Sequence, residues 1–342
     1  YMAFGQLPLV AGIFYGIKPA VTALVLHAAH RIGGRALRNA WMWAIAVVAF
    51  VAIFALRLPF PAIVLAAALI GLVGGRLRPD LFVVGGGHGG TPAGYGLAVI
   101  DDDTPTPPHA FFSRRHLVKV LLVGGGLWVL AMAVLVASVG LQGTLTQMGW
   151  FFTKAALLTF GGAYAVLPYV FQGAVEQQQW LSAAQMIDGL ALGETTPGPL
   201  IMVVAFVGFV GGWLKQILGP DALFVGGALA ATVVTFFTFL PSFIFILAGG
   251  PLIETTHGNL KFTAPLTAIT AAVVGVVASL ALFFWGHIAF KTGGAGFVLA
   301  NLDWPALLIA GAAAIALLRY KFGVMTVIAF CALTGLALRL LS

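Results

Sequence analysis

The sequence has few charged residues, few acidic residues and a single cysteine. Only 8% of its 342 residues are charged, against about a quarter in an ordinary soluble domain. Together with a hydrophobic content of 61%, this excludes a water-soluble enzyme, a disordered protein and a nucleic-acid binder. The lone Cys331 excludes a disulfide framework and a thiolate metal site. The class that remains is an all-α polytopic membrane protein.

Long apolar runs make up most of the chain. A transmembrane helix needs about 20 apolar residues, because it rises roughly 1.5 Å per residue across a hydrocarbon core near 30 Å thick. The sequence predicts ten such spans, at residues 9–31, 40–56, 60–76, 117–140, 150–170, 199–217, 221–249, 263–290, 304–318 and 322–341.

One segment, residues 77–116, is too polar to enter a membrane. Its glycines, prolines and three consecutive aspartates predict a solvated linker. His88, His109 and His116 lie in it, but no metal-ligand spacing connects them. We therefore interpret them as polar residues of a linker and expect neither a metal nor another cofactor.

The order of the spans predicts two related halves. Residues 17–25 align with 269–277, and residues 43–61 align with 304–323, so each copy reads as a long helix, a polar loop and a helical hairpin. Chance similarity between apolar stretches is the alternative. The predicted units are the C-terminal part of a first repeat, the linker, a linking transmembrane helix and a second complete repeat, at residues 1–76, 77–116, 117–140 and 141–342.

Basic residues give the two copies opposite orientations. In the first half, the positive-inside rule assigns one face to the cytoplasm. That face carries Arg31, Arg35, Arg38, Arg76, Arg78, Arg114, Arg115 and Lys119. In the second copy the loop carries Lys291 and Asp303, whereas the hairpin tip carries Arg319 and Lys321. One linking helix would therefore make the repeats inverted, which is typical of secondary transporters, with the C-terminus periplasmic or extracellular.

The repeat also predicts sequence upstream of this chain. Residues 141–256 precede the repeated unit in the second half, and no counterpart precedes Tyr1 in the first. We expect roughly 100 further residues, about three helices, in a parent of about 13 spans arranged as inverted halves around the linking helix. A naturally shortened protein with one and a half repeats is the alternative.

Residues 150–199 contain two positions where a membrane helix can unwind, Gly161-Gly162 and Pro197-Gly198-Pro199. Backbone groups freed there must find partners or line a water-filled cavity. A helix that restarts after such a break directs its free N–H groups toward an anion. Broken or re-entrant helices at both positions would form an oxyanion site, and close helix packing or a simple helix end are the structural alternatives.

Polar side chains flank both breaks. The candidate substrate-binding groups are one ammonium and four hydroxyls, those of Lys154, Thr159, Tyr164, Thr195 and Thr196. Glu194 and Asp188 are candidates for coupling proton movement to anion movement, because an acidic group in a membrane is usually functional. The alternatives are a structural role for Glu194, as a partner of Lys154 or of backbone N–H groups, and a water-facing position for Asp188.

Two further positions bear on the local structure. Ser182 is a plausible N-cap for a short helix that follows a polar break. Lys18, inside the first predicted span, either faces the substrate path or extends its ammonium toward the helix end.

Several motifs in this region occur in order: residues 159–168, Trp180-Leu181, residues 188–193, residues 196–199 and residues 240–243. Their order and spacing resemble the chromate ion transporter family. The resemblance implies a bacterial or archaeal carrier of the inner (plasma) membrane that exports chromate, a sulfate-like divalent oxyanion, and so confers chromate resistance. The substrate-binding residues that it implies are Phe160, Gly161, Gly162, Tyr164, Pro197, Gly198 and Pro199.

The chain departs from the family pattern in two respects. Long members resemble a tandem of two homologous domains, each with Phe-Gly-Gly and Pro-Gly-Pro motifs, whereas this chain has the second set alone. Glu194 stands where a glutamine or a similar polar residue is frequent, so its role is not implied by the family.

The interrupted helices and the family resemblance together predict export of chromate and no enzymatic activity. The sequence contains no Walker motif, so we expect an ion gradient to supply the energy, as in a secondary active transporter. A carrier for sulfate or another oxyanion is the alternative. An intramembrane enzyme with Asp188 and Glu194 as acid and base is a remote one. The expected partners are the oxyanion and the lipid bilayer, without nucleic acid. The sequence leaves the oligomeric state open, with a homodimer as one option.

Overall fold

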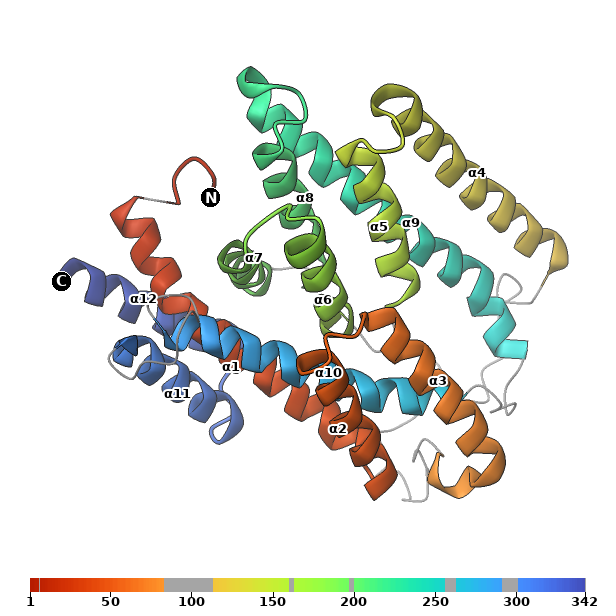
Figure 1. Cartoon of the computed structure of the whole chain (residues 1–342), viewed down its shortest axis with the longest axis horizontal. Coiled ribbons are helices and arrows are strands. Elements are labelled where there is room, and N and C mark those ends of the chain that lie inside the picture. The colour runs from red at the N-terminus through yellow and green to blue at the C-terminus, as the bar shows by residue number, and fades with distance from the viewer. Residues whose placement is uncertain are drawn as a thin grey trace, which may run out of the picture.

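The computed structural model describes residues 1–5, 7–82, 113–159, 163–196, 200–255, 263–290 and 301–341. Helices make up nearly all of this part of the chain (Figure 1), which confirms the predicted all-α class. Residues 83–112, which form most of the predicted linker and include His88 and His109, lie outside the described residues.

The first part of the chain forms a long helix and a helical hairpin. These are α1 (Pro8–Ala36), α2 (Ala40–Phe54) and α3 (Phe60–Leu77), followed by a 3-10 turn, Pro79–Leu81. Asn39 caps α2 by accepting a hydrogen bond from the Met42 amide at 3.0 Å. Pro59 immediately precedes α3, and Pro61 stands in its first turn, where a proline disrupts no helical hydrogen bond.

The middle of the chain contains two long helices, α4 (Arg114–Val139) and α9 (Leu223–Thr255), with four shorter helices between them. The shorter ones are α5 (Thr144–Leu157), α6 (Ala163–Phe171) with a π-helical turn (Gln172–Gln177), α7 (Ala183–Thr195) and α8 (Val203–Leu214). Two 3-10 turns, Leu200–Met202 and Pro220–Ala222, precede α8 and α9. The last three helices are α10 (Thr263–Ala289), α11 (Trp304–Leu318) and α12 (Val324–Leu341).

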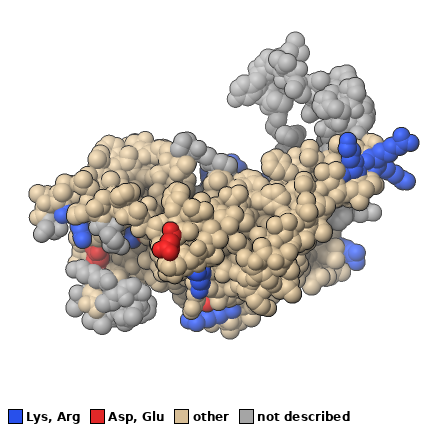
Figure 2. Space-filling model, turned by 90° about the horizontal axis from the view of Figure 1, so that it is seen from above, with Lys and Arg blue, Asp and Glu red and all other residues tan. Residues whose placement is uncertain are grey.

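Among the described residues, six helices are long and apolar enough to cross a membrane: α1, α3, α4, α9, α10 and α12. Helices α2, α8 and α11 are apolar but shorter. Large apolar side chains cover the outside, such as Leu122 and Leu130 of α4, which are 70% and 62% exposed. Charged side chains are sparse on the face in Figure 2, apart from a basic group at one end. The chain is a multi-pass membrane protein.

Two predicted spans differ from the observed helices. The expected span 150–170 is divided between α5 and α6, and the expected span 199–217 is shortened to α8 with a preceding 3-10 turn. The reason is local: α5 ends at Leu157 before the Gly-Gly position, and the second helix starts only after Pro-Gly-Pro. The predicted linker is also too long, because Arg114–His116 form the first turn of α4.

The two long helices α1 and α10 cross at the centre and run in opposite directions (Figure 1). Tyr15, near the start of α1, donates a hydrogen bond to Asp303 at 2.6 Å, and the Asp303 amide bonds to the Ala289 carbonyl at the end of α10. Each long helix packs on the hairpin of the other half: α1 on α11 and α12, α10 on α2 and α3. Reciprocal packing of this kind is what two related units would produce, and the repeat boundaries stay a prediction.

Small residues allow these helices to approach closely. A Cβ atom on Gly16 of α1 would lie 1.9 Å from the Cys331 carbonyl oxygen of α12. In the other half, a Cβ atom on Gly71 of α3 would lie 2.6 Å from the Ala264 carbonyl oxygen of α10. Helices in a membrane associate through such contacts between small residues, since lipid supplies no hydrophobic driving force.

Candidate functional site

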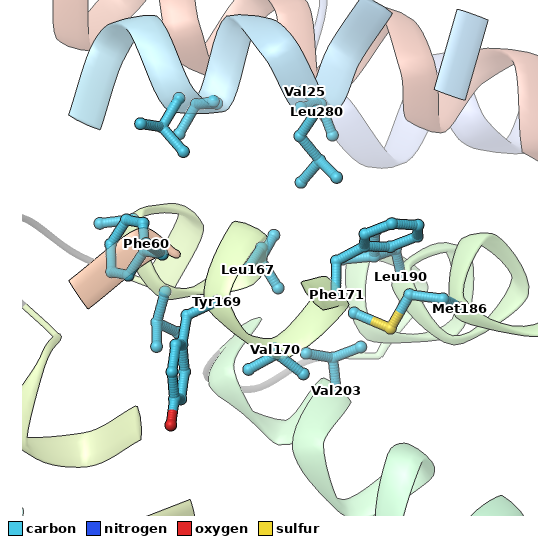
Figure 3. Close-up of a cluster of buried hydrophobic side chains, with 14 of the residues drawn as sticks. Val25, Phe60, Leu167, Tyr169, Val170, Phe171, Met186, Leu190, Val203 and Leu280 are labelled. Carbon is cyan, nitrogen blue, oxygen red and sulfur yellow. The ribbon is translucent and has the colours of Figure 1, made fainter. Parts of the chain in front are cut away.

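Helix α6 lies at the centre of the molecule and is enclosed on both sides. Figure 3 shows its residues Leu167, Val170 and Phe171 between Val25 and Leu280, from α1 and α10, and a second group from α7 and α8. Leu167 and Val170 are at most 1% exposed. The segment after the Gly-Gly position therefore lies in the protein interior and does not face lipid.

Helices end and restart at both predicted breaks. Helix α5 ends at Leu157 and α6 begins at Ala163; α7 ends at Thr195, and the 3-10 turn before α8 begins at Leu200. Six predicted site residues between these helices lie outside the described residues: Phe160, Gly161, Gly162, Pro197, Gly198 and Pro199.

The structure brings the flanks of the two breaks together. The Tyr164 hydroxyl, just after the first break, donates a hydrogen bond to the Glu194 carboxylate, just before the second. The 3-10 turn Leu200–Met202 packs against both α6 and α7. The start of α6 and the end of α7 therefore lie side by side, and the turn that leads into α8 packs against both helices.

Helix α7 begins at the residue that the sequence predicts. The Ser182 hydroxyl accepts a hydrogen bond from the Gln185 amide at 3.2 Å, and the Gln185 side chain accepts one from the Ser182 amide at 2.8 Å. This capping box fixes the start of α7. The N-cap prediction is confirmed.

Asp188 of α7 is buried and paired with a lysine. Its carboxylate Oδ1 lies 3.0 Å from the Nζ of Lys18 on α1, and its Oδ2 accepts a hydrogen bond from the Tyr1 hydroxyl at 2.7 Å. Asp188 is only 4% exposed, so the water-facing interpretation is wrong. Lys18 points to the neighbouring helix, and pairing with it compensates the unfavourable burial of the Asp188 charge.

A cavity of about 230 Å³ adjoins this ion pair. Lys18, Asp188 and Gln185 supply its polar wall, and Phe14 and Met2 are among its apolar lining residues. The cavity has room for several water molecules, each of which occupies about 30 Å³ in the liquid.

Glu194 bonds to Tyr164 and not to Lys154. Lys154 is exposed on α5, with its Nζ 5.9 Å from the centroid of the Trp150 ring. The predicted alternative of a Lys154–Glu194 pair is therefore wrong. Arg31, an exposed residue of α1, exerts a weaker electrostatic influence on both Glu194 and Tyr164. Its position in the sequence bears on membrane orientation and gives no sign of this influence.

Lys154 borders a different cavity, of about 400 Å³, with Tyr169, Gln172 and Gln177. Gln172, in the π-helical turn, holds the tip of the α2–α3 hairpin. Its amide nitrogen donates to the Leu58 carbonyl at 3.1 Å, and its amide oxygen accepts from the Phe60 amide at 3.0 Å.

The three candidate threonines direct their protons to the backbone. Thr159 donates to the Ala155 carbonyl at 2.7 Å, and Thr195 and Thr196 donate to the Leu192 carbonyl at 3.0 and 2.7 Å. In this arrangement their hydroxyl oxygens can only accept hydrogen bonds. Each side chain must rotate about χ1 before it can donate to an oxyanion.

Asp188 and Glu194 have separate partners, so the structure does not join them as an acid–base pair. Within the described ranges, no group of three or more His, Cys, Asp and Glu side chains is arranged to hold a metal ion. The site elements are buried carboxylates, cations on α1 and interrupted helices.

The sequence profile described as "Chromate transporter" matches residues 1–72 and 146–336. The chain belongs to the chromate transporter family. The matched ranges leave out residues 73–145, which contain α4 and most of the predicted linker.

Curated relatives of this transporter family member come from several bacteria. The chain is 33% identical to the chromate transport protein of Pseudomonas aeruginosa over 77% of its own length and 53% of that protein. It is 24% identical to a probable chromate transport protein of Synechococcus elongatus, over 81% of the chain and 58% of that protein. A chromate transport protein of Cupriavidus metallidurans is 30% identical over 56% of the chain and 42% of that protein.

The chain thus spans about half the length of the curated relatives that it matches. No solved structure matches it significantly.

Proposed function

We propose that the protein is a secondary active transporter that exports chromate across the inner (plasma) membrane of a bacterium or archaeon, and so confers chromate resistance. The observation that carries this proposal is the meeting of two interrupted helices in the interior, where Tyr164 bonds to Glu194. Discontinuous helices whose half-helix ends meet near the membrane midplane are typical of carrier binding sites.

The chemistry of the region suits a divalent tetrahedral oxyanion. Helix starts supply N–H donors and the positive ends of helix dipoles. Lys154, Thr159, Tyr164, Thr195 and Thr196 flank the two breaks in the sequence and would supply an ammonium and hydroxyls. The break positions in the sequence are Phe160, Gly161, Gly162, Pro197, Gly198 and Pro199. The names of the relatives in Pseudomonas aeruginosa and Cupriavidus metallidurans give chromate as their substrate, which favours chromate here.

Energy for export comes, in this proposal, from an ion gradient. Glu194 is the candidate for coupling at the breaks, because it is part-buried, bonded to Tyr164 and influenced by Arg31. Movement of one helical unit against the other would expose the site alternately to the two sides of the membrane.

Transport of radiolabelled chromate into everted membrane vesicles tests the proposal. We expect energised vesicles that contain the chain to accumulate chromate faster than vesicles without it, and an excess of unlabelled sulfate to compete weakly. Equal rates in both vesicle types would refute chromate export. Stronger inhibition by sulfate than by unlabelled chromate would show that the carrier serves sulfate, the alternative substrate.

A further inference from the structure

We propose that the Lys18 ammonium pairs with the transported oxyanion. When no oxyanion is bound, the Asp188 carboxylate pairs with the same ammonium. This inference rests on the proposed transport function and adds a second anion subsite to it. In this account Asp188 acts as an internal substitute for the substrate.

The Lys18 ammonium contacts a buried carboxylate and also borders a cavity. Asp188 Oδ1 lies 3.0 Å from Lys18 Nζ, and both side chains line the cavity of about 230 Å³. The Lys18 side chain is 32% exposed, whereas that of Asp188 is 5% exposed. Lys18 is therefore the member of the pair that an anion in the cavity can reach.

Spare hydrogen-bonding capacity is present beside the pair. An ammonium has three N–H donors, and Asp188 Oδ1 takes the position of one partner. Thr22 lies one helical turn after Lys18, and its hydroxyl is buried without a hydrogen-bond partner in the described part of the chain. Pro19 has no N–H to donate to the Tyr15 carbonyl, so α1 lacks one backbone hydrogen bond at this point.

Electrostatic repulsion opposes binding of the oxyanion and of the Asp188 carboxylate to Lys18 at the same time. A divalent oxyanion beside Lys18 would repel the Asp188 carboxylate, because like charges in a partly buried site repel each other more strongly than they do in bulk water. The dianion also attracts the ammonium more strongly than a single carboxylate does. The two anions therefore compete for Lys18, and α7 must shift relative to α1 when one replaces the other.

This competition links the site to movement of the protein. Lys18 belongs to the long helix of the first half, and Asp188 belongs to a short helix of the second. When the substrate enters, the Lys18–Asp188 contact breaks and α7 can move away from α1. When the substrate leaves, the contact forms again and α7 packs against α1. An empty carrier with Lys18 unpaired is disfavoured, since the lysine would then be an uncompensated intramembrane charge.

The test uses a neutral pair, Lys18→Gln with Asp188→Asn, which removes both charges at nearly constant volume. A matched control, Lys215→Gln with Asp221→Asn, removes one lysine and one aspartate from exposed positions around the α8–α9 turn. We expect both double variants to purify and unfold thermally like the unaltered chain. We expect the control to keep binding and transport of radiolabelled chromate, and the neutral pair to lose at least about 100-fold in chromate affinity.

A purely structural ion pair gives the opposite result, because its neutral replacement would keep both chromate binding and transport. That outcome overturns the inference and leaves the transport proposal standing. Failure of the unaltered chain to bind or transport chromate would instead refute the transport proposal, and this inference with it.

The chromate KM of the single variant Asp188→Asn is an independent test of the competition for Lys18. Removal of the competing carboxylate should lower the chromate KM several-fold, whereas Lys18→Gln should raise it. A KM for Asp188→Asn equal to or above that of the unaltered chain contradicts competition for Lys18.

Discussion

Tyr164 follows the first helix break and donates a hydrogen bond to Glu194, which precedes the second. The two residues are thirty positions apart in the sequence and belong to different helices. Their contact places the residues that flank the two breaks beside each other in the protein interior. If the two breaks lay far apart, each could be a simple helix end. Two breaks whose flanking residues are in contact can instead contribute to one binding site.

Tyr164→Phe tests this contact. The variant leaves the Glu194 carboxylate without its donor, so we expect a loss of about 1–3 kcal/mol in the free energy of unfolding. The chromate transport rate should fall by about tenfold, in line with a lost interaction of about 1.4 kcal/mol. Denaturant titration in detergent and vesicle transport measure the two effects.

Tyr320→Phe is the matched control, because Tyr320 is 65% exposed at the α11–α12 turn. We expect it to match the unaltered chain in both assays. Equal behaviour of the two variants would show that the Tyr164–Glu194 contact supports neither stability nor transport.

Gly16→Ala tests the close approach of α1 and α12. The added Cβ atom would lie 1.9 Å from the Cys331 carbonyl oxygen, which is backbone and cannot move aside alone. We expect the helices to separate at a cost of about 3 kcal/mol or more, since overpacking typically costs about 1–3 kcal/mol. The melting temperature in detergent should fall accordingly.

The control for this variant is Gly126→Ala on α4, where the new Cβ atom meets no described atom within 4 Å. Its melting temperature should equal or exceed that of the unaltered chain, because alanine favours a helix more than glycine does. An unchanged melting temperature for Gly16→Ala would contradict the packing of α1 on α12.

The sequence predicts those parts of the fold that local chemistry determines. Ser182 begins α7 because its hydroxyl and the Gln185 side chain form reciprocal bonds over three residues. Pro59 and Pro61 likewise place the turn between α2 and α3. The helices also stop near Gly161-Gly162 and Pro197-Gly198-Pro199, as the unwinding argument predicts.

The sequence does not predict which helices face each other. Helix α10 is apolar over nearly all of its length, and the few charged residues of α1 form no continuous stripe, so neither pattern shows which side is buried. The Lys18–Asp188 pair depends on packing between residues 170 positions apart in the sequence. No single sequence motif contains both residues. For the same reason the sequence predicts a role for Arg31 in membrane orientation but not its electrostatic influence on Glu194.

Lys154→Ala tests the cation at the first break. Lys154 is exposed, lies over Trp150 and borders the cavity of about 400 Å³. We expect loss of chromate transport without loss of protein, because the variant removes a positive charge next to the break. Undiminished transport would remove Lys154 from the site and leave the breaks and Lys18 as the anion-binding elements.

The most direct test of the central claim is the initial rate of radiolabelled chromate uptake into everted vesicles that contain Gly162→Val. The claim is that an unwound helix at this position forms the oxyanion site, and a β-branched side chain there restricts the backbone. The control is Gly126→Val on α4, where a Cβ atom has open space. With equal amounts of protein in the membrane, the account predicts that Gly162→Val abolishes uptake while Gly126→Val retains it. Uptake by Gly162→Val at the rate of the unaltered chain would contradict the account.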